Sequence, residues 1–385
     1  MARIDLDLAH SYKPNPQHDS DYALLPLKMC FEDGGAYALL GPSGCGKTSL
    51  LNIISGLVTP SQGSVTFDGV PMNSKTPQQR NIAQVFQFPV IYDTMTVAEN
   101  LAFPLRNRGV AADKIAQRVG KIAEMLELSG QLDVRAAGLA ADAKQKISLG
   151  RGLVREDVSA VLFDEPLTVI DPHLKWQLRR KLKQIHHELK LTLVYVTHDQ
   201  VEALTFADQV VVMTRGRAVQ IGSASDLFER PQHTFVGHFI GSPGMNFLPA
   251  ERSGDGLTVA GCAVAADRVV PPAPGRLVLG IRPEYVTLAG PHAPGAVPAT
   301  VLQAQDIGTY WLVTAQVGPG IEGAVGAAGS TAAAGPTTVR ARLSPDANIP
   351  VAGAAVWLAV LGPHTCFYAD DVLIGEAPEP QKVSA

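Results

Sequence analysis

The sequence has few cysteines, and they are widely separated. Cys30, Cys45, Cys262 and Cys366 show neither metal-ligand spacing nor the density of a disulfide framework in a chain of 385 residues. Thiolate metal centres and small disulfide-stabilised secreted domains are therefore excluded. We expect reduced thiols in a reducing compartment.

Long apolar runs and an excess of positive charge are also missing. No window approaches 18 uninterrupted apolar residues, and the opening MARIDLDLAH lacks the basic and apolar regions of a secretory signal. We therefore expect any membrane connection to run through a partner chain. The net charge is −4 and the pI about 6.2, so no basic field favours a nucleic-acid partner.

What is present is a chain long enough for two domains, with 46% hydrophobic residues. Through residue 240, strand-like runs such as AYALLG and AVLFDE alternate with helical patterns such as HLKWQLRRKLKQIHHEL, which predicts a parallel sheet covered by helices. From 241 to 385, short strand-like runs separated by Gly and Pro predict a small all-β domain. Within it we expect a flexible, low-complexity loop at 318–336 and a solvated tail at 376–385.

The segment GPSGCGKT has the pattern of a phosphate-binding loop. Gly41 and Gly46 bracket four residues before Lys47 and Thr48, between a predicted strand and a predicted helix. In such a loop backbone N–H groups surround phosphate oxygens, the lysine reaches the outer phosphates and the threonine hydroxyl faces Mg²⁺. The sequence therefore predicts a nucleoside triphosphate site.

Polar residues end three other predicted strands. Asp164 and Glu165 end the strand in VLFDEP, where Asp164 is suited to hold Mg²⁺ through water and Glu165 to polarise the attacking water. Gln87 ends AQVFQ, and His198 ends LVYVTH. Because these motifs accompany the phosphate-binding loop, we interpret His198 as a γ-phosphate contact rather than a histidine satisfied by backbone.

The order of these motifs, followed by VIDP and VTHDQVEA, resembles an ATP-binding cassette (ABC) ATPase. The stretch from 196 to 247 is similar to the ATPase subunits of carbohydrate and polyol importers, the maltose and glycerol-3-phosphate transporter type. The resemblance implies an α/β P-loop ABC ATPase domain, with a mixed sheet and a helical subdomain at about 88–153. It further implies an OB-like regulatory domain. The segment LGIRPEYV (279–286) is similar to the opening strand of that domain.

The resemblance also implies site residues. Thr48, Gln87 and Asp164 become Mg²⁺ ligands, Glu165 the general base, and Asp171 a residue of the dimer seam. The residues implied to wrap the triphosphate are Gly41, Pro42, Ser43, Gly44, Cys45, Gly46, Lys47, Thr48 and Ser49.

An aromatic residue stacks on adenine in this family, about thirty residues before the lysine. The segment SYKPNPQHDSDYALL (11–25) contains an apparent insertion at this point. Tyr12 is the predicted stacking residue and Tyr22 is the alternative. The third possibility is that neither tyrosine stacks on adenine.

The family signature Leu-Ser-Gly-Gly-Gln, which closes over the nucleotide of the opposite subunit, is altered here. It is replaced by Leu139, Ala140, Ala141, Asp142 and Ala143. Ala140 has no hydroxyl for a phosphate oxygen, and Asp142 brings a negative charge towards a tetra-anionic nucleotide, where repulsion is on the order of a few kcal/mol. The following KQKISLGRGLV keeps the family spacing, so we expect binding to suffer more than the helix.

These features predict an ATPase that energises solute import, as half of an asymmetric heterodimer with one competent site. The alternative is an ATP-binding regulatory half that seldom hydrolyses, and an ATPase acting on nucleic acid is disfavoured. The expected partners are a second ABC ATPase with an intact signature, two membrane-spanning permease subunits and a periplasmic or extracellular solute-binding protein. The expected location is the cytoplasmic face of the inner membrane, and the apolar segment 88–105 is either a permease docking surface or helical-subdomain core.

Overall fold

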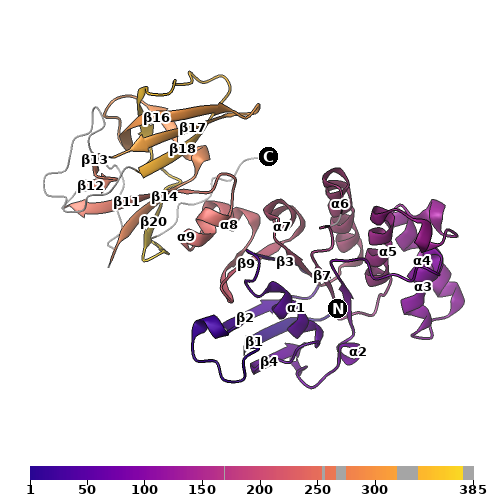
Figure 1. Cartoon of the computed structure of the whole chain (residues 1–385). Helices are drawn as coiled ribbons and strands as arrows, with labels where there is room; N and C mark the ends of the chain where they lie inside the picture. Colours follow the sequence, from indigo (N-terminus) through magenta and orange to yellow (C-terminus); the bar gives the residue numbers. More distant parts are fainter. Residues whose placement is uncertain (169, 254–255, 266–274, 319–336, 376–385) are drawn as a thin grey trace. The chain divides into compact units, whose positions relative to one another are not determined.

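The computed structural model describes residues 1–168, 170–253, 256–265, 275–318 and 337–375. The predicted tail at 376–385, and all but the first residue of the predicted loop at 318–336, lie outside these ranges. The chain divides into two compact units, Met1–Ala224 and Ser225–Ala385. Figure 1 shows the elements of each unit.

The first unit is built on two sheets. The larger has the order β10-β9-β3-β8-β7-β6, in which the five strands from β9 to β6 are parallel and β10 is antiparallel. Its strands are β3 (Ala36–Leu40), β6 (Ile82–Val85), β7 (Ala160–Asp164), β8 (Leu193–Thr197), β9 (Gln209–Thr214) and β10 (Arg217–Gly222). Every residue of β3 and β8 is buried, as expected of central parallel strands covered on both faces.

The smaller sheet of this unit is antiparallel, with the order β2-β1-β4-β5. Its strands are β1 (Ile4–His10), β2 (Leu24–Phe31), β4 (Gln62–Phe67) and β5 (Val70–Pro71). In β1, Ile4, Leu6 and Leu8 are buried, and they join the hydrophobic core that also contains residues of β3 and of the first helix.

Seven helices lie within the first unit. They are α1 (Lys47–Ser55), α2 (Pro77–Arg80), α3 (Val97–Arg106), α4 (Ala112–Met125), α5 (Ala141–Leu153), α6 (Pro172–Leu189) and α7 (Gln200–Phe206). The helices α3, α4 and α5 pack on one another, and Figure 1 shows them as a group of their own. Three 3₁₀ turns, η1 (Asp19–Asp21), η2 (Ser129–Gln131) and η3 (Ala136–Gly138), complete the unit.

The second unit is a β-structure entered through two short helices, α8 (Ala224–Glu229) and α9 (Thr234–Phe239). Its antiparallel sheets have the orders β13-β12-β11-β14-β20-β21 and β15-β19-β16-β17-β18, and one core cluster contains residues of both. The strands are β11 (Asn246–Ser253), β12 (Gly256–Val259), β13 (Cys262–Val264), β14 (Leu277–Ile281), β15 (Thr287–Ala289), β16 (Ala296–Asp306), β17 (Trp311–Val317), β18 (Thr337–Leu343), β19 (Ala355–Ala359), β20 (Cys366–Ala369) and β21 (Val372–Ile374), with the turn η4 (Pro283–Tyr285).

The segment between residues 225 and 240 belongs to the second unit because Arg282 holds it there. The guanidinium of this fully buried side chain donates to the carbonyls of Leu227, Phe228, Gly237 and Ile240. The sequence-based boundary, after residue 240, falls at the end of this segment and stays a prediction.

No helix within the described ranges has the length and apolar character needed to cross a membrane.

Candidate functional site

The predicted phosphate-binding loop lies between the end of β3 and the start of α1. Gly46 caps the helix with a φ of +102°, a conformation that favours glycine, and a Cβ there would lie 2.5 Å from the carbonyl oxygen of Ala23. A Cβ on Gly41 would lie 2.2 Å from the carbonyl oxygen of Met213. Both glycines are therefore required by close backbone approach. The tip of the loop, comprising Pro42, Ser43 and Gly44, is exposed.

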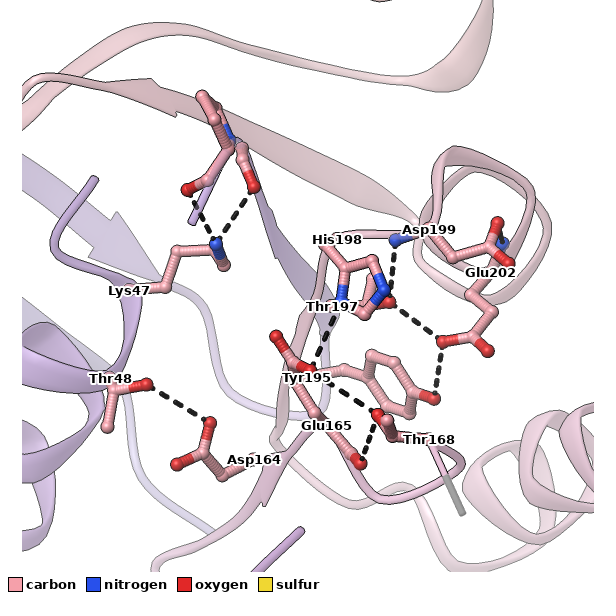
Figure 2. A network of polar contacts seen from close by, with 12 residues as sticks. Lys47, Thr48, Asp164, Glu165, Thr168, Tyr195, Thr197, His198, Asp199 and Glu202 are labelled. Carbon is pink, nitrogen blue, oxygen red and sulfur yellow. Dashed lines mark hydrogen bonds and ion pairs between the residues drawn. The ribbon is translucent and has the colours of Figure 1, made fainter. Parts of the chain in front are cut away.

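Lys47 is folded into the middle of this loop. Its Nζ donates to the carbonyl oxygens of Gly41 at 2.8 Å and Pro42 at 3.0 Å, as Figure 2 shows. Its side chain is buried, so the ammonium group is a positive charge fixed at the loop. Burial raises the pKa of the Cys45 thiol, and the charge of Lys47 acts in the opposite direction.

The ends of β7 and the start of α1 bring two oxygen ligands together. The hydroxyl of Thr48 donates to Oδ1 of Asp164 at 3.4 Å. Burial raises the pKa of Asp164, the negative charge of Glu165 raises it further, and the Thr48 hydrogen bond and Lys47 oppose the rise. A half-buried carboxylate beside a hydroxyl is a site that a hard cation stabilises.

Glu165 follows β7 in an unusual backbone conformation. Its φ is +46°, in the left-handed region, and its N–H donates to the carbonyl oxygen of Val196 in β8. Its Oε2 lies 3.1 Å from Nδ1 of His198, and the Thr168 hydroxyl donates to the same oxygen at 3.3 Å. The left-handed turn therefore directs the carboxylate towards the histidine at the end of the neighbouring strand.

A buried network supports the loop that carries His198. Glu202 accepts hydrogen bonds from the hydroxyls of Thr197 at 2.8 Å and Tyr195 at 3.1 Å, and the Thr197 hydroxyl accepts from the N–H of Asp199. Sequence reasoning missed these residues. Asp199 and Glu202 have capping-box spacing, but Glu202 turns away from the helix end to the buried hydroxyls, while Asp199 caps α7.

Tyr12 lies beyond the end of β1 and is 64% exposed. Its hydroxyl is 3.1 Å from Oγ of Ser49, in the first turn of α1. Tyr22, the alternative, is half-buried after the turn η1. The structure thus brings Tyr12 next to the predicted phosphate-binding residues.

The altered signature begins the helix α5. Leu139 is extended, Ala140 is the N-cap without a side-chain hydrogen bond, and Ala141 is exposed in the first turn. Ala143 is buried, and Asp142 lines a cavity that Glu127, Lys146 and Lys181 also line.

Glu127 forms ion pairs with both lysines, each at 3.7 Å. The Asp142 carboxylate therefore lies among charges of both signs.

Two further predicted residues, Gln87 and Asp171, follow β6 and precede α6. Gln87 is half-buried, two residues beyond the end of β6. Asp171 is exposed, and its carbonyl oxygen accepts from the N–H of Lys175 at the start of α6. Their roles stay predictions.

The donor set suits a cation that keeps water and substrate oxygens as ligands. Within the described residues, no group of three or more His, Cys, Asp or Glu side chains could hold a metal ion. Thr48 and Asp164 nevertheless fit Mg²⁺, because this ion is commonly bound by one or two protein oxygens together with phosphates.

Comparison with known proteins agrees with these features. Residues 24–168 match the family described as ABC transporter, and residues 241–286 match the MalK OB fold domain. The sn-glycerol-3-phosphate import ATP-binding protein UgpC of Cereibacter sphaeroides is 44% identical over 265 residues, which is 68% of this chain and 74% of the relative. The trehalose import ATP-binding protein SugC of Mycobacterium tuberculosis is 42% identical over 292 residues, which is 74% and 73% of the two chains.

A solved structure gives the same result for the fold. CbiO1 from Clostridium perfringens, described as part of the ABC transporter complex CbiONQ, superposes with a TM-score of 0.54 at 25% identity. The match covers 59% of this chain and 90% of that chain.

Proposed function

Because this chain belongs to the family of ATP-binding subunits of ABC importers, with a carbohydrate and polyol uptake ATPase domain followed by an OB-fold domain, we propose that it is the hydrolytic subunit of an asymmetric pair. Members of this family are ATPases that drive transport. One observation carries the proposal for this chain: three neighbouring strands of one parallel sheet bring these residues together. Lys47 begins the helix that follows β3, Asp164 and Glu165 lie at the end of β7, and His198 follows β8.

Each of these residues has one role in the proposed reaction. Backbone N–H groups of the loop and Lys47 bind the phosphates, since the ammonium group is already fixed at the loop. Glu165 accepts a proton of the attacking water, whose oxygen bonds to the γ-phosphorus as the bond from that phosphorus to the bridging oxygen breaks, so that ADP and phosphate are released. His198 contacts the γ-phosphate, and its hydrogen bond with Glu165 holds the two side chains in one arrangement.

Thr48, Asp164 and Gln87 would hold Mg²⁺, which would supply positive charge to neutralise the triphosphate. The partial burial that raises the pKa of Asp164 supports this assignment, because a cation would offset the cost of keeping the carboxylate ionised there.

The altered signature supports the asymmetric pair. In this family the signature of one subunit completes the nucleotide site of the other, with Asp171 at the seam between them. Ala140 lacks a hydroxyl, and Asp142 brings a carboxylate to the start of α5. A second ABC ATPase with an intact signature completes the site built on Lys47, Glu165 and His198, and only the opposite site is impaired.

The names of the relatives support a proposal for the solute and the partners. UgpC is named for sn-glycerol-3-phosphate import and SugC for trehalose import. We propose a sugar, a polyol such as glycerol, or a glycerol phosphate as the solute. Two permease subunits and a solute-binding protein complete the transporter, with this chain bound peripherally at the cytoplasmic face of the inner membrane.

The alternative function is an ATP-binding regulatory half with little hydrolysis of its own. The altered signature favours it, and the Glu165–His198 pair argues against it.

The first experiment is to tag this chain, extract its complex gently from the native membrane, and identify every ATPase subunit in it. A second ATPase with an intact signature supports the asymmetric pair, and recovery of this chain as the sole ATPase subunit contradicts it. In the same complex, Glu165→Gln separates the two functions: transport collapses if this chain hydrolyses ATP and survives if it is regulatory.

A further inference from the structure

The loop between β1 and β2, residues 13–22, has no role in the function proposed above. It follows Tyr12, the exposed aromatic side chain beside the phosphate-binding loop. Exposed aromatic side chains ordinarily lose rotational freedom when they bind a ligand, and holding them in place beforehand lowers that cost. The backbone on both sides of Tyr12 is held in this way.

On the N-terminal side the support is Ser61, which precedes β4. Its Oγ accepts from the N–H of Ser11 at 2.9 Å, lies 2.9 Å from the Ser11 carbonyl oxygen, and lies 3.1 Å from Nδ1 of His10. The buried His10 ring meets the Tyr12 ring edge to face, with centroids 4.5 Å apart. One edge of the Tyr12 region is thus packed against the sheet.

On the C-terminal side the support is Asp21. Its carboxylate pairs with the Lys13 ammonium group and accepts from the N–H groups of Gln17 at 2.9 Å and His18 at 3.2 Å. The Asp21 carbonyl oxygen accepts from the Ser11 hydroxyl at 2.8 Å. Asp21 therefore connects the beginning, the middle and the end of the loop to the residue before Tyr12.

The Asp21 side chain is 11% exposed, although its partner Lys13 is largely in solvent. The hydrogen bonds from Lys13 and Gln17 lower the pKa of Asp21 to about 2. The carboxylate therefore remains ionised, and able to accept these hydrogen bonds, throughout the physiological pH range.

We propose that Asp21 is a positioning residue for nucleotide binding, which acts by holding Tyr12 in place to stack on the purine base. The inference rests on the proposed function, because it requires Tyr12 to contact the base. Asp21 itself does not touch the nucleotide. The Tyr12 hydroxyl, 3.1 Å from Ser49, ties the ring to the helix that follows the phosphate-binding loop.

The test compares a ligand that has a base with one that lacks it, using the full-length chain. Two affinities are measured for wild type, Tyr12→Ala, Asp21→Asn and the double variant. They are the affinity for ADP and the affinity for inorganic pyrophosphate, the latter as an inhibition constant. We expect Asp21→Asn to weaken ADP binding about threefold to tenfold, the range for one aromatic stacking contact, and to leave pyrophosphate unchanged. In ATP hydrolysis by the assembled transporter, we expect Asp21→Asn to raise KM and to leave kcat unchanged.

The double variant shows whether Asp21 acts through Tyr12. It should bind ADP no more weakly than Tyr12→Ala alone, because a ring that is absent cannot be positioned. Asp19→Asn is the matched control: Asp19 lies in the same loop and pairs with Arg217 at 2.7 Å at the surface, so ADP affinity should not change.

Four results overturn the proposal. If Asp21→Asn weakens the binding of ADP and of pyrophosphate equally, Asp21 supports the phosphate-binding loop instead. If the losses of ADP affinity add up in the double variant, Asp21 acts independently of Tyr12. An unchanged ADP affinity in Asp21→Asn, with a loss in Tyr12→Ala, rejects the positioning role alone. An unchanged affinity in Tyr12→Ala also rejects the proposed base contact.

Discussion

At the residue scale, the site contains a strained residue and a buried charge. Glu165 has a left-handed backbone, which costs of order 1 kcal/mol for a residue other than glycine. Asp164 keeps a carboxylate in a half-buried place where its pKa is raised. Both features are unfavourable for folding alone, and the proposed reaction would account for both.

Glu165→Gln should reduce ATP hydrolysis by the assembled transporter at least about 100-fold, because the amide cannot accept the proton of the attacking water. ATP binding should persist. Steady-state phosphate release and nucleotide binding measure the two effects. Thr168→Ala is the control, since it keeps the Glu165 carboxylate, removes the hydroxyl that donates to Oε2 and to the Glu165 carbonyl oxygen, and should cost less than about tenfold. Equal losses in both variants would reject Glu165 as the base.

Asp164→Asn should raise the melting temperature of the nucleotide-free chain by a few degrees at pH 7 and abolish hydrolysis. Burial raises the pKa of Asp164 in the folded state, so the ionised form destabilises the fold above that pKa. The difference between variant and wild type should therefore shrink as the pH falls through the raised pKa. Melting curves from pH 8 downwards measure it, and a gap that widens on acidification contradicts the assignment.

At the element scale, α5 shows how a helix survives the loss of its family motif. Ala140 cannot cap the helix with a side chain, but Asp142 places a negative charge in the first turn, where the helix dipole favours it. The buried side of α5 is unchanged in character: Ile147 and Leu149 lie in the core, and Gln145 donates to the carbonyl oxygen of Pro166. The helix is therefore maintained by packing, and the altered residues lie at its N-terminal end.

Restoring the family signature with Ala140→Ser, Ala141→Gly, Asp142→Gly and Ala143→Gln should raise ATP hydrolysis by the assembled transporter, up to about twofold, because a second independent site adds to the first. Phosphate release by the purified complex measures it. The matched control is Asp142→Asn alone, which removes the charge without restoring the backbone approach. A decrease in hydrolysis with the restored signature would show that the alteration serves the cycle.

Arg282 is the corresponding feature of the second unit, where one side chain satisfies carbonyls near the ends of two short helices. Arg282→Ala leaves these buried acceptors without donors and should lower the free energy of unfolding by about 3 kcal/mol or more. Denaturant unfolding of the full chain measures the loss. Arg276→Ala, at an exposed position, should leave the free energy of unfolding unchanged. An unchanged free energy of unfolding in Arg282→Ala would contradict the stabilising role of Arg282.

At the scale of the whole molecule, the two units have separate cores and different chemistry. All the predicted site residues lie in the α/β unit, and the all-β unit holds none of them. The four cysteines, which span both units, form no disulfide bond. Cys45, Cys262 and Cys366 are buried, and Cys30 is half-buried.

The thiols should therefore react slowly in the native protein. Burial, with help from Asp5 and Glu32, raises the pKa of Cys30 to about 12, and burial raises the pKa of Cys45 and Cys262. Thiolate is the reactive form, so brief maleimide treatment at pH 7 should leave the intact mass unchanged, whereas the unfolded chain takes up four labels. Rapid native labelling would contradict this burial.

Much of the fold could be predicted from the sequence because it depends on local pattern. The apolar runs at 36–41 and 160–165 form β3 and β7, and the amphipathic pattern at 173–189 forms α6. The ABC ATPase fold, the OB-fold second domain and the importer family are confirmed. The phosphate-binding loop could be found because glycine spacing and the lysine lie within eight residues.

Other features arise from contacts between distant segments, and a local pattern does not contain them. The sequence by itself determined the elements, the phosphate-binding loop and the order of the nucleotide motifs, since these depend on neighbours along the chain. Only the tertiary structure decided that Glu202 turns to Thr197 and Tyr195, that Ser61 and Asp21 hold the residues around Tyr12, and that Arg282 gathers the segment from 225 to 240. Each joins buried or converging polar groups from separate elements, and such groups find partners only when the chain has folded.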